Sequence, residues 1–386
     1  ERNSFFEEEH IQKIIAHVLN HAMDRYGYSY VAQWKIEIDR ASFQTPGQYV
    51  TYSSRLFKTI RQINSQIGCG GPLFDVSRPP EELIGLLHDW SNSGFLPDFI
   101  TVSVYPYANE TTVSLNPDIN IKRLAQLSRK LAPIRAREMS QTTAPDRMSG
   151  PTMAQFTDPL PLYVADFGFT RARSSYINDT VFMAAYTLHN FIGMKDYANM
   201  IALPALSDMS ASPAAGSGNL LIGGRGMLTC HSLFKPVFFA QRYLAGLGEK
   251  LLECGNGRIT TMNLNGDISM ILYNYRHPAA FYCQEENHRL TLSHINDFYE
   301  DGAPVHFDIR LTHLPAARYQ VVRFRLSKEY GSIIDVWAAS KGISRVKNET
   351  INYLRQTLAP RADFFEIENV DGIRLQEKVG AQEILS

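Results

Sequence analysis

Short apolar runs that end abruptly in polar residues recur through the first two thirds of the chain. The clearest are the WKIEIDRAS segment at 34–42 and the YVADFG segment at 163–168. This pattern is typical of buried parallel strands that deliver side chains to the loops at their carboxyl ends. Five such strands are predicted, at 34–39, 67–71, 99–105, 162–166 and 199–203.

Apolar residues at helical spacing separate these strands. They predict helices at 7–26, 47–65, 79–93, 119–138, 179–193 and 236–252. A segment at 205–226 is rich in Ser, Ala and Gly and is predicted to be a long loop. The alternation of strand and helix indicates a parallel sheet or barrel.

After about Cys254 the pattern changes to short strands separated by turn signals. The Asn-Leu-Asn-Gly-Asp sequence at 263–267 predicts a hairpin. Further strands are predicted at 305–311, 319–326, 364–368 and 372–378. This region is therefore expected to form a β-sandwich.

Composition narrows the class of protein. The chain has 386 residues, of which 44% are hydrophobic and 20% charged, and it contains no run of 18 apolar residues. We expect a soluble protein with large cores and no membrane partner. The net charge of −1 gives no overall attraction to nucleic acid. DNA is therefore expected to be contacted only through a domain outside this chain.

The four cysteines show no CxxC spacing, which indicates reduced thiols and a cytoplasmic location. The chain begins Glu-Arg-Asn-Ser without an initiator Met or a signal peptide, so we expect it to be part of a longer polypeptide. His17 and His21 lie four apart on a helix, but neither the glutamate of HExxH nor a third ligand accompanies them. The glycines of 216–226 do not form GxGxxG. No metal and no cofactor are predicted.

Six basic residues on the helix at 119–138 admit two interpretations. They form either a DNA-facing patch or the solvated back of an outer barrel helix. An apolar stripe along the same helix, which includes Leu124, Leu127 and Leu131, favours the second interpretation.

An ordered series of motifs resembles glycoside hydrolase family 39, the β-xylosidase and α-iduronidase family of retaining (β/α)₈ glycosidases. The series runs through DRYGYSYVAQWKIEI, Gly70-Gly71-Pro72, DFITVSVYPY, Asn178-Asp179-Thr180, Ser207-Asp208, GGRGML with Lys235-Pro236, RLTHLPAARYQVVRF and EYGSIIDVWAASKG. The resemblance implies an α/β fold, with a (β/α)₈ barrel portion over 1–254 and a C-terminal β-sandwich over 255–386. Barrel strands four to eight are recognisable and strands one to three are not. We expect the missing part upstream in the natural protein, or a fragment that partners hold.

The resemblance also implies where the two catalytic carboxylates of a retaining glycosidase belong. The acid/base is the Glu of the family motif W-N-E-P-N, and Ala41 stands at its position, after Asp39 at the Trp and Arg40 at the Asn. A methyl group cannot donate a proton. The nucleophile is the Glu of T-E-W-N, and Asp166 matches it with a carboxylate one methylene shorter.

Other positions of the implied site have changed as well. The His of F-I-S-x-H-x-Y-P is replaced by Ser103, whereas Tyr105 is kept. The Trp before Ser-Asp on strand eight is replaced by Pro204. The predicted ligand-binding residues are Arg40, Ser103, Tyr105, Asp208 and Arg225.

For three of the site residues a structural role competes with the functional one. Asp166 is a nucleophile or an ion-pair partner of Arg40. Tyr105 stacks a sugar or fills the core. Arg225 lies over the expected barrel mouth or is a solvated loop charge.

The resemblance and the replaced residues lead to a catalytically impaired module. We expect it to be the carbohydrate-sensing part of a bacterial AraC-type transcription regulator, because family 39-like domains occur at the C-terminal end of such regulators. One alternative is an active retaining exo-β-glycosidase with Asp166 as nucleophile and Asp39 as acid/base. The other is a structural or dimerisation scaffold. A carbohydrate ligand is the expected partner, and the sequence leaves a homodimer open.

Overall fold

The structure is a computed structural model that describes residues 8–109, 112–141, 160–210, 219–284, 292–299, 302–315, 317–342, 346–369 and 372–386. The density of contacts divides the chain into two compact units. The first comprises 1–104, 120–167 and 194–202, and the second comprises 105–119, 168–193 and 203–386. The predicted domain boundary between residues 254 and 255 stays a prediction.

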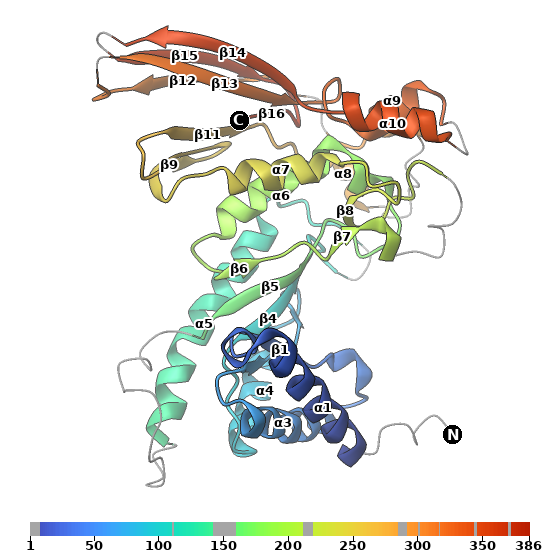
Figure 1. The fold of residues 1–386 in the computed structure, drawn as a ribbon, viewed down its shortest axis with the longest axis vertical. Coiled ribbons are helices and arrows are strands. Elements are labelled where there is room, and N and C mark those ends of the chain that lie inside the picture. Colours follow the sequence, from blue (N-terminus) through green and yellow to red (C-terminus); the bar gives the residue numbers. More distant parts are fainter. Residues whose placement is uncertain are drawn as a thin grey trace. The chain divides into compact units, whose positions relative to one another are not determined.

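The first unit contains the predicted parallel strands (Figure 1). Its helices are α1 (Glu8–Tyr26), α2 (Tyr28–Val31), α3 (Pro46–Ile63), α4 (Pro80–Asn92) and most of α5 (Ile119–Gln141). Its strands are β1 (Lys35–Glu37), β2 (Gly68–Gly70), β3 (Phe74–Asp75), β4 (Ile100–Val104), β5 (Leu162–Phe167) and β6 (Met200–Ile201). β1 pairs with β2, and β3, β4, β5 and β6 form one sheet in that order, with every pair parallel. The five predicted strands are confirmed as β1, β2, β4, β5 and β6, and the short strand β3 was not predicted.

The four-stranded sheet has one apolar and one mixed face. Side chains on the apolar face are at most 3% exposed, and they include Ile100, Val102, Val104, Leu162 and Val164. Because side chains alternate along a strand, the residues between them point to the other face. Those residues are Thr101, Ser103 and Tyr163, and two of the three are only half-buried. The polar residues predicted for the site therefore lie on the mixed face.

Helices α3 and α4 form a small core beside β1. Thr45 caps α3 by accepting a hydrogen bond from the backbone N–H of Gln48, and Pro46 begins the helix. Trp90 of α4 donates its indole N–H to Ser53 Oγ of α3 at 2.8 Å. Tyr49 of α3 donates its hydroxyl to the carbonyl of Ile38 at 3.4 Å, which ties the residue after β1 to this core.

The second unit contains the antiparallel sheets predicted for the C-terminal region. Its helices are α6 (Val181–Met194), α7 (Pro236–Ala245), α8 (Ala280–Gln284), α9 (Ile333–Ala339) and α10 (Asn348–Thr357). Its strands are β7 (Ala205–Ser207), β8 (Gly226–Leu228), β9 (Lys250–Gly255), β10 (Arg258–Met262), β11 (Ile268–Tyr273), β12 (Val305–Leu311), β13 (Arg318–Leu326), β14 (Arg361–Glu368), β15 (Ile373–Val379) and β16 (Ile384–Leu385). Six strands form a sheet in the order β14-β13-β16-β11-β10-β9, and β12 pairs with β15 in a separate ribbon. The predicted hairpin joins β10 to β11, where Asn263 Oδ1 accepts hydrogen bonds from the backbone N–H groups of Asn265 and Asp267.

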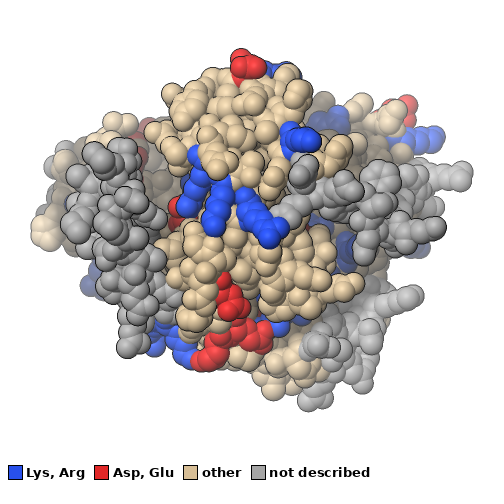
Figure 2. Space-filling view, turned by 90° about the horizontal axis from the view of Figure 1, so that it is seen from below, with Lys and Arg blue, Asp and Glu red and all other residues tan. Residues whose placement is uncertain are grey.

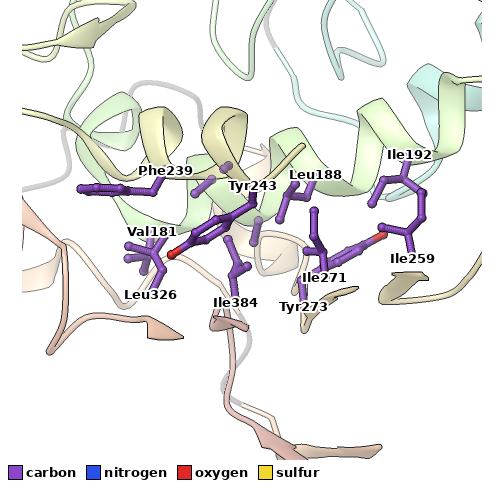
Figure 3. Close-up of a cluster of buried hydrophobic side chains, with 13 residues drawn as sticks. Val181, Leu188, Ile192, Phe239, Tyr243, Ile259, Ile271, Tyr273, Leu326 and Ile384 are labelled. Carbon is purple, nitrogen blue, oxygen red and sulfur yellow. The ribbon is translucent and has the colours of Figure 1, made fainter. Parts of the chain in front are cut away.

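A buried apolar core of the second unit lies between the six-stranded sheet and helices α6 and α7 (Figure 3). Its members are at most 7% exposed and include Val181 and Leu188 of α6, Tyr243 of α7, and Ile271 and Ile384 of the sheet. The sheet residues next to the last two, Leu272 and Leu385, face the other way and pack with the β12–β15 ribbon. The apolar run ISMILY of β11 is thus explained by a sheet that is buried on both faces.

Three predictions for this region were wrong. The helix predicted at 236–252 ends at Ala245, because residues from Lys250 pair with β10 as strand β9. The segment predicted as a loop at 205–226 contains strand β7 at its start and the first residue of β8 at its end, and these two strands pair in parallel. Residues 211–218 lie outside the described residues. Helices α9 and α10 were missed, since only strands were predicted beyond residue 305.

Candidate functional site

The carboxyl ends of three parallel strands in the first unit place polar side chains in one row. Asp75 of β3 pairs with Ser103 of β4, and Ser103 pairs with Asp166 of β5. Paired residues of a parallel sheet point to the same face. Two of the predicted site residues, Ser103 and Asp166, are therefore neighbours at this edge. Asp75 was not among the predicted site residues.

A β-bulge decides which residue of β5 joins that row. Val164 pairs with Val102, but Asp166 rather than Ala165 pairs with Ser103. The extra residue turns the Asp166 side chain to the mixed face of the sheet, where strict alternation would have placed Ala165. Bulges of this kind are common beside active sites because they re-aim a side chain. The geometry places Asp166 beside Ser103 on the mixed face, and its predicted role as nucleophile stays a prediction.

The segment after β1 holds the position predicted for the acid/base. Ala41 lies in a single 3₁₀ turn, Arg40–Ser42, and its side chain is exposed. Asp39 precedes the turn, and its Oδ1 accepts a hydrogen bond from the backbone N–H of Ala41 at 2.9 Å. Asp39 is itself exposed, and Arg40 is half-buried. The one carboxylate next to Ala41 in the chain thus caps a turn at the surface of the protein.

Glu37, at the end of β1, has the environment that Asp39 lacks. Burial raises the pKa of the Glu37 carboxyl above its ordinary value, a hydrogen bond from Thr101 opposes this, and the nearby charge of Asp39 adds to it. Thr101 Oγ1 accepts from the backbone N–H of Leu73 at 2.8 Å, so the hydroxyl hydrogen is left to donate to Glu37. Sequence reasoning used Glu37 only as a motif match.

In the second unit, Tyr105 lies against two arginines. The Cζ atoms of Arg225 and Arg171 lie 5.3 and 5.6 Å from the centre of the Tyr105 ring, and Arg225 Nη2 donates to the Tyr105 hydroxyl. Arg171 also lies 4.9 Å from the ring of Tyr107. Tyr105 is only 3% exposed, so it offers little ring surface for stacking a sugar. Its predicted ligand role, like that of Arg225, stays a prediction. Sequence reasoning missed Arg171.

A fully buried ion network lies beneath the glycine-rich loop that carries Arg225. Lys235 Nζ lies 2.6 Å from Asp179 Oδ1 and 2.7 Å from Asp208 Oδ2, and it donates to the carbonyl of Gly224 at 2.9 Å. All three charged side chains are 0% exposed. Asp208 Oδ1 also accepts from the backbone N–H of Gly226 at 2.9 Å. These contacts give Asp208 a structural role, and its predicted ligand role stays a prediction.

The same network explains the GGRG sequence and perturbs one carboxyl group. A Cβ atom on Gly224 would lie 2.4 Å from Asp208 Oδ1, and one on Gly226 would lie 2.4 Å from the backbone of Ser207. Only glycine allows the loop to approach this closely. Burial raises the pKa of Asp179 to about 6, opposed by Lys235 and reinforced by Asp208. A lysine between two ionised aspartates leaves one buried negative charge, which explains why Asp179 holds a proton so readily.

The predicted site residues are divided between the units. The first holds Asp39, Arg40, Ala41, Ser103 and Asp166, and the second holds Tyr105, Asp208 and Arg225. Within the described ranges, no group of three or more His, Cys, Asp or Glu side chains is arranged to hold a metal ion. Among the helices of those ranges, none combines the length and the apolar character needed to cross a bilayer.

Charge on the surface in Figure 2 is mixed. A few Lys and Arg side chains lie near the middle of this view, a group of Asp and Glu side chains lies below them, and most of the coloured surface is uncharged. A nucleic-acid-binding face is expected to be continuously basic. The coloured part of this face does not have that character.

Comparison with known proteins identifies a matching family model and a curated relative. The model of glycosyl hydrolases family 39 matches residues 6–274. A β-xylosidase from Geobacillus stearothermophilus is 21% identical over 272 residues, which are 68% of this chain and 51% of the relative. The chain thus spans about half the length of this curated relative.

Two solved structures resemble almost the whole chain. The GH39 enzyme from Xanthomonas axonopodis pv. citri superposes with a TM-score of 0.77 and 16% identity, covering 98% of this chain and 72% of its own. A monomeric β-xylosidase from Caulobacter crescentus gives a TM-score of 0.78 and 16% identity, covering 98% and 74%. These matches show an α/β fold of the TIM-barrel family with antiparallel C-terminal sheets. Because the family model matches more than half of the residues, the chain belongs to glycoside hydrolase family 39.

Proposed function

We propose that this chain is a carbohydrate-binding module of glycoside hydrolase family 39 whose catalytic activity is impaired. The observation that carries the proposal is the exposed methyl group of Ala41 at the position predicted for the acid/base. The neighbouring carboxylate of Asp39 supports the proposal because it is engaged as the cap of a turn.

The chemistry of retaining glycosidases explains why the loss of the acid/base at Ala41 should reduce the rate of hydrolysis strongly. The leaving oxygen needs a proton from a carboxylic acid about 5 to 5.5 Å from the nucleophile. General acid catalysis contributes typically 10²- to 10⁴-fold to the rate. A shorter nucleophile at Asp166 lowers the rate further, since a misplacement of about 1 Å costs on the order of a hundredfold. Sugar binding does not depend on this proton transfer.

We further propose that the module senses a sugar within a bacterial AraC-type transcription regulator in the cytoplasm. DNA would then be contacted by a domain outside this chain. The four free cysteines support a reducing compartment. The binding signal would pass through a change in assembly, for which a homodimer is the simplest form.

Calorimetry and hydrolysis together test the proposal. The chain is titrated with xylose, glucose, xylobiose and cellobiose, and the same sugars and 4-nitrophenyl β-xyloside are assayed for hydrolysis. Saturable binding of one sugar without cleavage of the disaccharides is the expected result. Sedimentation with and without that sugar tests the sensor role. Cleavage of xylobiose that is abolished in Asp166→Asn would refute the impaired reading, and absence of all binding with a stable oligomer would favour a scaffold.

The second candidate is an active retaining exo-β-glycosidase that uses Asp166 as nucleophile and Asp39 as acid/base. The bulge that turns Asp166 toward the row with Ser103 favours it, because the nucleophile position is kept. A lost acid affects poor leaving groups most. Equal hydrolysis of xylobiose and the nitrophenyl substrate, with loss of both in Asp39→Asn, therefore distinguishes this enzyme from the impaired module.

A further inference from the structure

A cavity of about 270 Å³ lies between the two antiparallel sheets of the second unit. Its walls come from the six-stranded sheet on one side and from the β12–β15 ribbon on the other. Its lining is mainly aliphatic and includes Met270, Leu272 and Val321 of the sheet and Ile309, Leu311 and Leu375 of the ribbon. None of these residues is among the predicted catalytic or sugar-binding positions.

Packing between the sheets is tight at one end of the ribbon and open at the other. Where Val305 pairs with Val379, Phe307 and Val379 join Leu272 and Leu385 in a buried cluster. Where Leu311 pairs with Ile373, at the opposite end, both residues line the cavity instead. The cavity therefore continues the space between the sheet and the ribbon that this buried cluster fills at the other end.

The charged side chains of the lining are already paired. Arg323 donates from Nη1 to Glu377 Oε1 at 2.7 Å and from Nη2 to Asp363 Oδ2 at 3.0 Å. Asp267, the third charged side chain of the lining, accepts from Asn263 Nδ2 at 2.8 Å. An ionic ligand would have to break these pairs. The lining thus favours an uncharged occupant.

Water is a poor occupant of such a space. Each buried water needs two to four polar partners, and aliphatic side chains supply none. Apolar surface gains roughly 25 cal/mol per Å² when it is removed from water. The rings of Tyr319 and Phe365 add aromatic surface to the wall. The volume lies between the roughly 150 Å³ of an apolar cavity that binds benzene and the about 300 Å³ at which pockets for larger ligands begin.

We propose that this inter-sheet cavity is a binding site for a neutral, largely apolar molecule of about the size of a two-ring aromatic. Its ligand differs in chemistry from the sugar of the proposed function. The two proposals are independent, and each is tested by its own experiment.

The test uses two fluorescent naphthalene probes with the 386-residue chain. Prodan is neutral, whereas 5-dimethylaminonaphthalene-1-sulfonate carries a negative charge on the same ring system. We expect prodan to bind saturably at one site per chain with a blue-shifted emission, and the sulfonate to bind at least tenfold more weakly. Equal binding of the sulfonate, or no saturable prodan signal, would overturn the proposal.

Paired variants locate the probe. Val321→Trp fills the cavity from the sheet, and Leu375→Trp fills it from the ribbon. Phe364→Trp is the matched control, because Phe364 precedes the lining residue Phe365 on β14, does not line the cavity itself and is 68% exposed. Both filling variants should lower prodan affinity at least tenfold, and the control should leave it within twofold. Circular dichroism identifies any variant that has unfolded. If one filling variant has unfolded, the prodan affinity of the other tests the proposal. Parent-like affinity in a folded filling variant would place the probe elsewhere and remove the proposal.

Discussion

Replacing Lys235 with Met removes the ammonium group that two buried carboxylates share. The three side chains are fully buried, and Lys235 Nζ lies 2.6 Å from Asp179 and 2.7 Å from Asp208. Met keeps the length of the side chain but leaves two carboxylates without a cation. Breaking a buried pair by removing one partner costs about 3 to 5 kcal/mol. We expect a loss of that size in the free energy of unfolding at pH 8, a large fraction of the total for a typical protein.

The loss should depend on pH in a direction that Asp179 sets. Its pKa in the folded protein is about 6, above the ordinary value of 3.8. A raised pKa stabilises the folded state fully below 3.8, and this contribution disappears as the pH rises through about 6. The difference amounts to about 3 kcal/mol at 1.36 kcal/mol per unit. Without the ammonium group the pKa of Asp179 rises further, so protonation at pH 5 should recover part of the stability lost in Lys235→Met.

Two titratable side chains near the network, Tyr176 and Cys230, do not contribute to this pH dependence. Burial raises the pKa of Tyr176 and of Cys230 above their ordinary values, so both stay neutral between pH 5 and pH 8. Urea unfolding, followed by circular dichroism at both pH values, measures the change. Lys250→Met is the matched control, since Lys250 is exposed on β9 of the same unit, and it should stay within about 0.5 kcal/mol of the parent. A loss below about 1 kcal/mol at pH 8, or one that is equal at pH 5 and pH 8, would refute the reasoning.

Three further predictions concern the buried network, the hydrogen bonds of Thr101 and the acid/base position. Asp179→Asn should be at least as stable as the parent at pH 8, and its unfolding free energy should lose the decrease between pH 4 and pH 7; a retained slope in urea unfolding would contradict the assignment. Thr101→Val should cost about 1 to 3 kcal/mol, because the Leu73 N–H and the Glu37 carboxyl both lose their partner, whereas Thr101→Ser should stay close to the parent in the same assay. Ala41→Glu should raise the rate of xylobiose hydrolysis at least tenfold in a chromatographic product assay, and an unchanged rate would count against Ala41 as the acid/base position.

The positions of β4 and β5 along the chain were predictable because both strands are rich in apolar residues. Their bounds differ by at most one residue from the predicted 99–105 and 162–166. The two-residue strand β3 is too short to leave such a pattern, and it was missed. The hairpin at 263–267 was predictable because Asn263 and Gly266 form the turn within their own segment. A strand or turn can be recognised in the sequence when the residues that form it lie within one short segment.

The side-chain geometry of the site was not predictable, because its causes lie far away in the sequence. The bulge at Ala165 exists only relative to the register with β4, more than fifty residues earlier in the chain. The end of α7 depends on the pairing of the following residues, as β9, with β10. The partners of Lys235 come from two other segments, around Asp179 and Asp208. Motif matching named Asp208 but could not distinguish a ligand-binding carboxylate from one that a buried lysine holds.

The buried network is better explained by the placement of a loop than by stability. An ion group of this kind is often no more stable than well-packed apolar side chains of the same volume, so its energy alone gives no reason for its presence. Its hydrogen bonds, however, fix the backbone on both sides of Arg225: Lys235 donates to the carbonyl of Gly224, and Asp208 accepts from the N–H of Gly226. An apolar core could not bind those two backbone groups, and it would leave them buried without partners. The network therefore gives Arg225 a fixed position against Tyr105, and it does so whether or not the chain still cleaves a sugar.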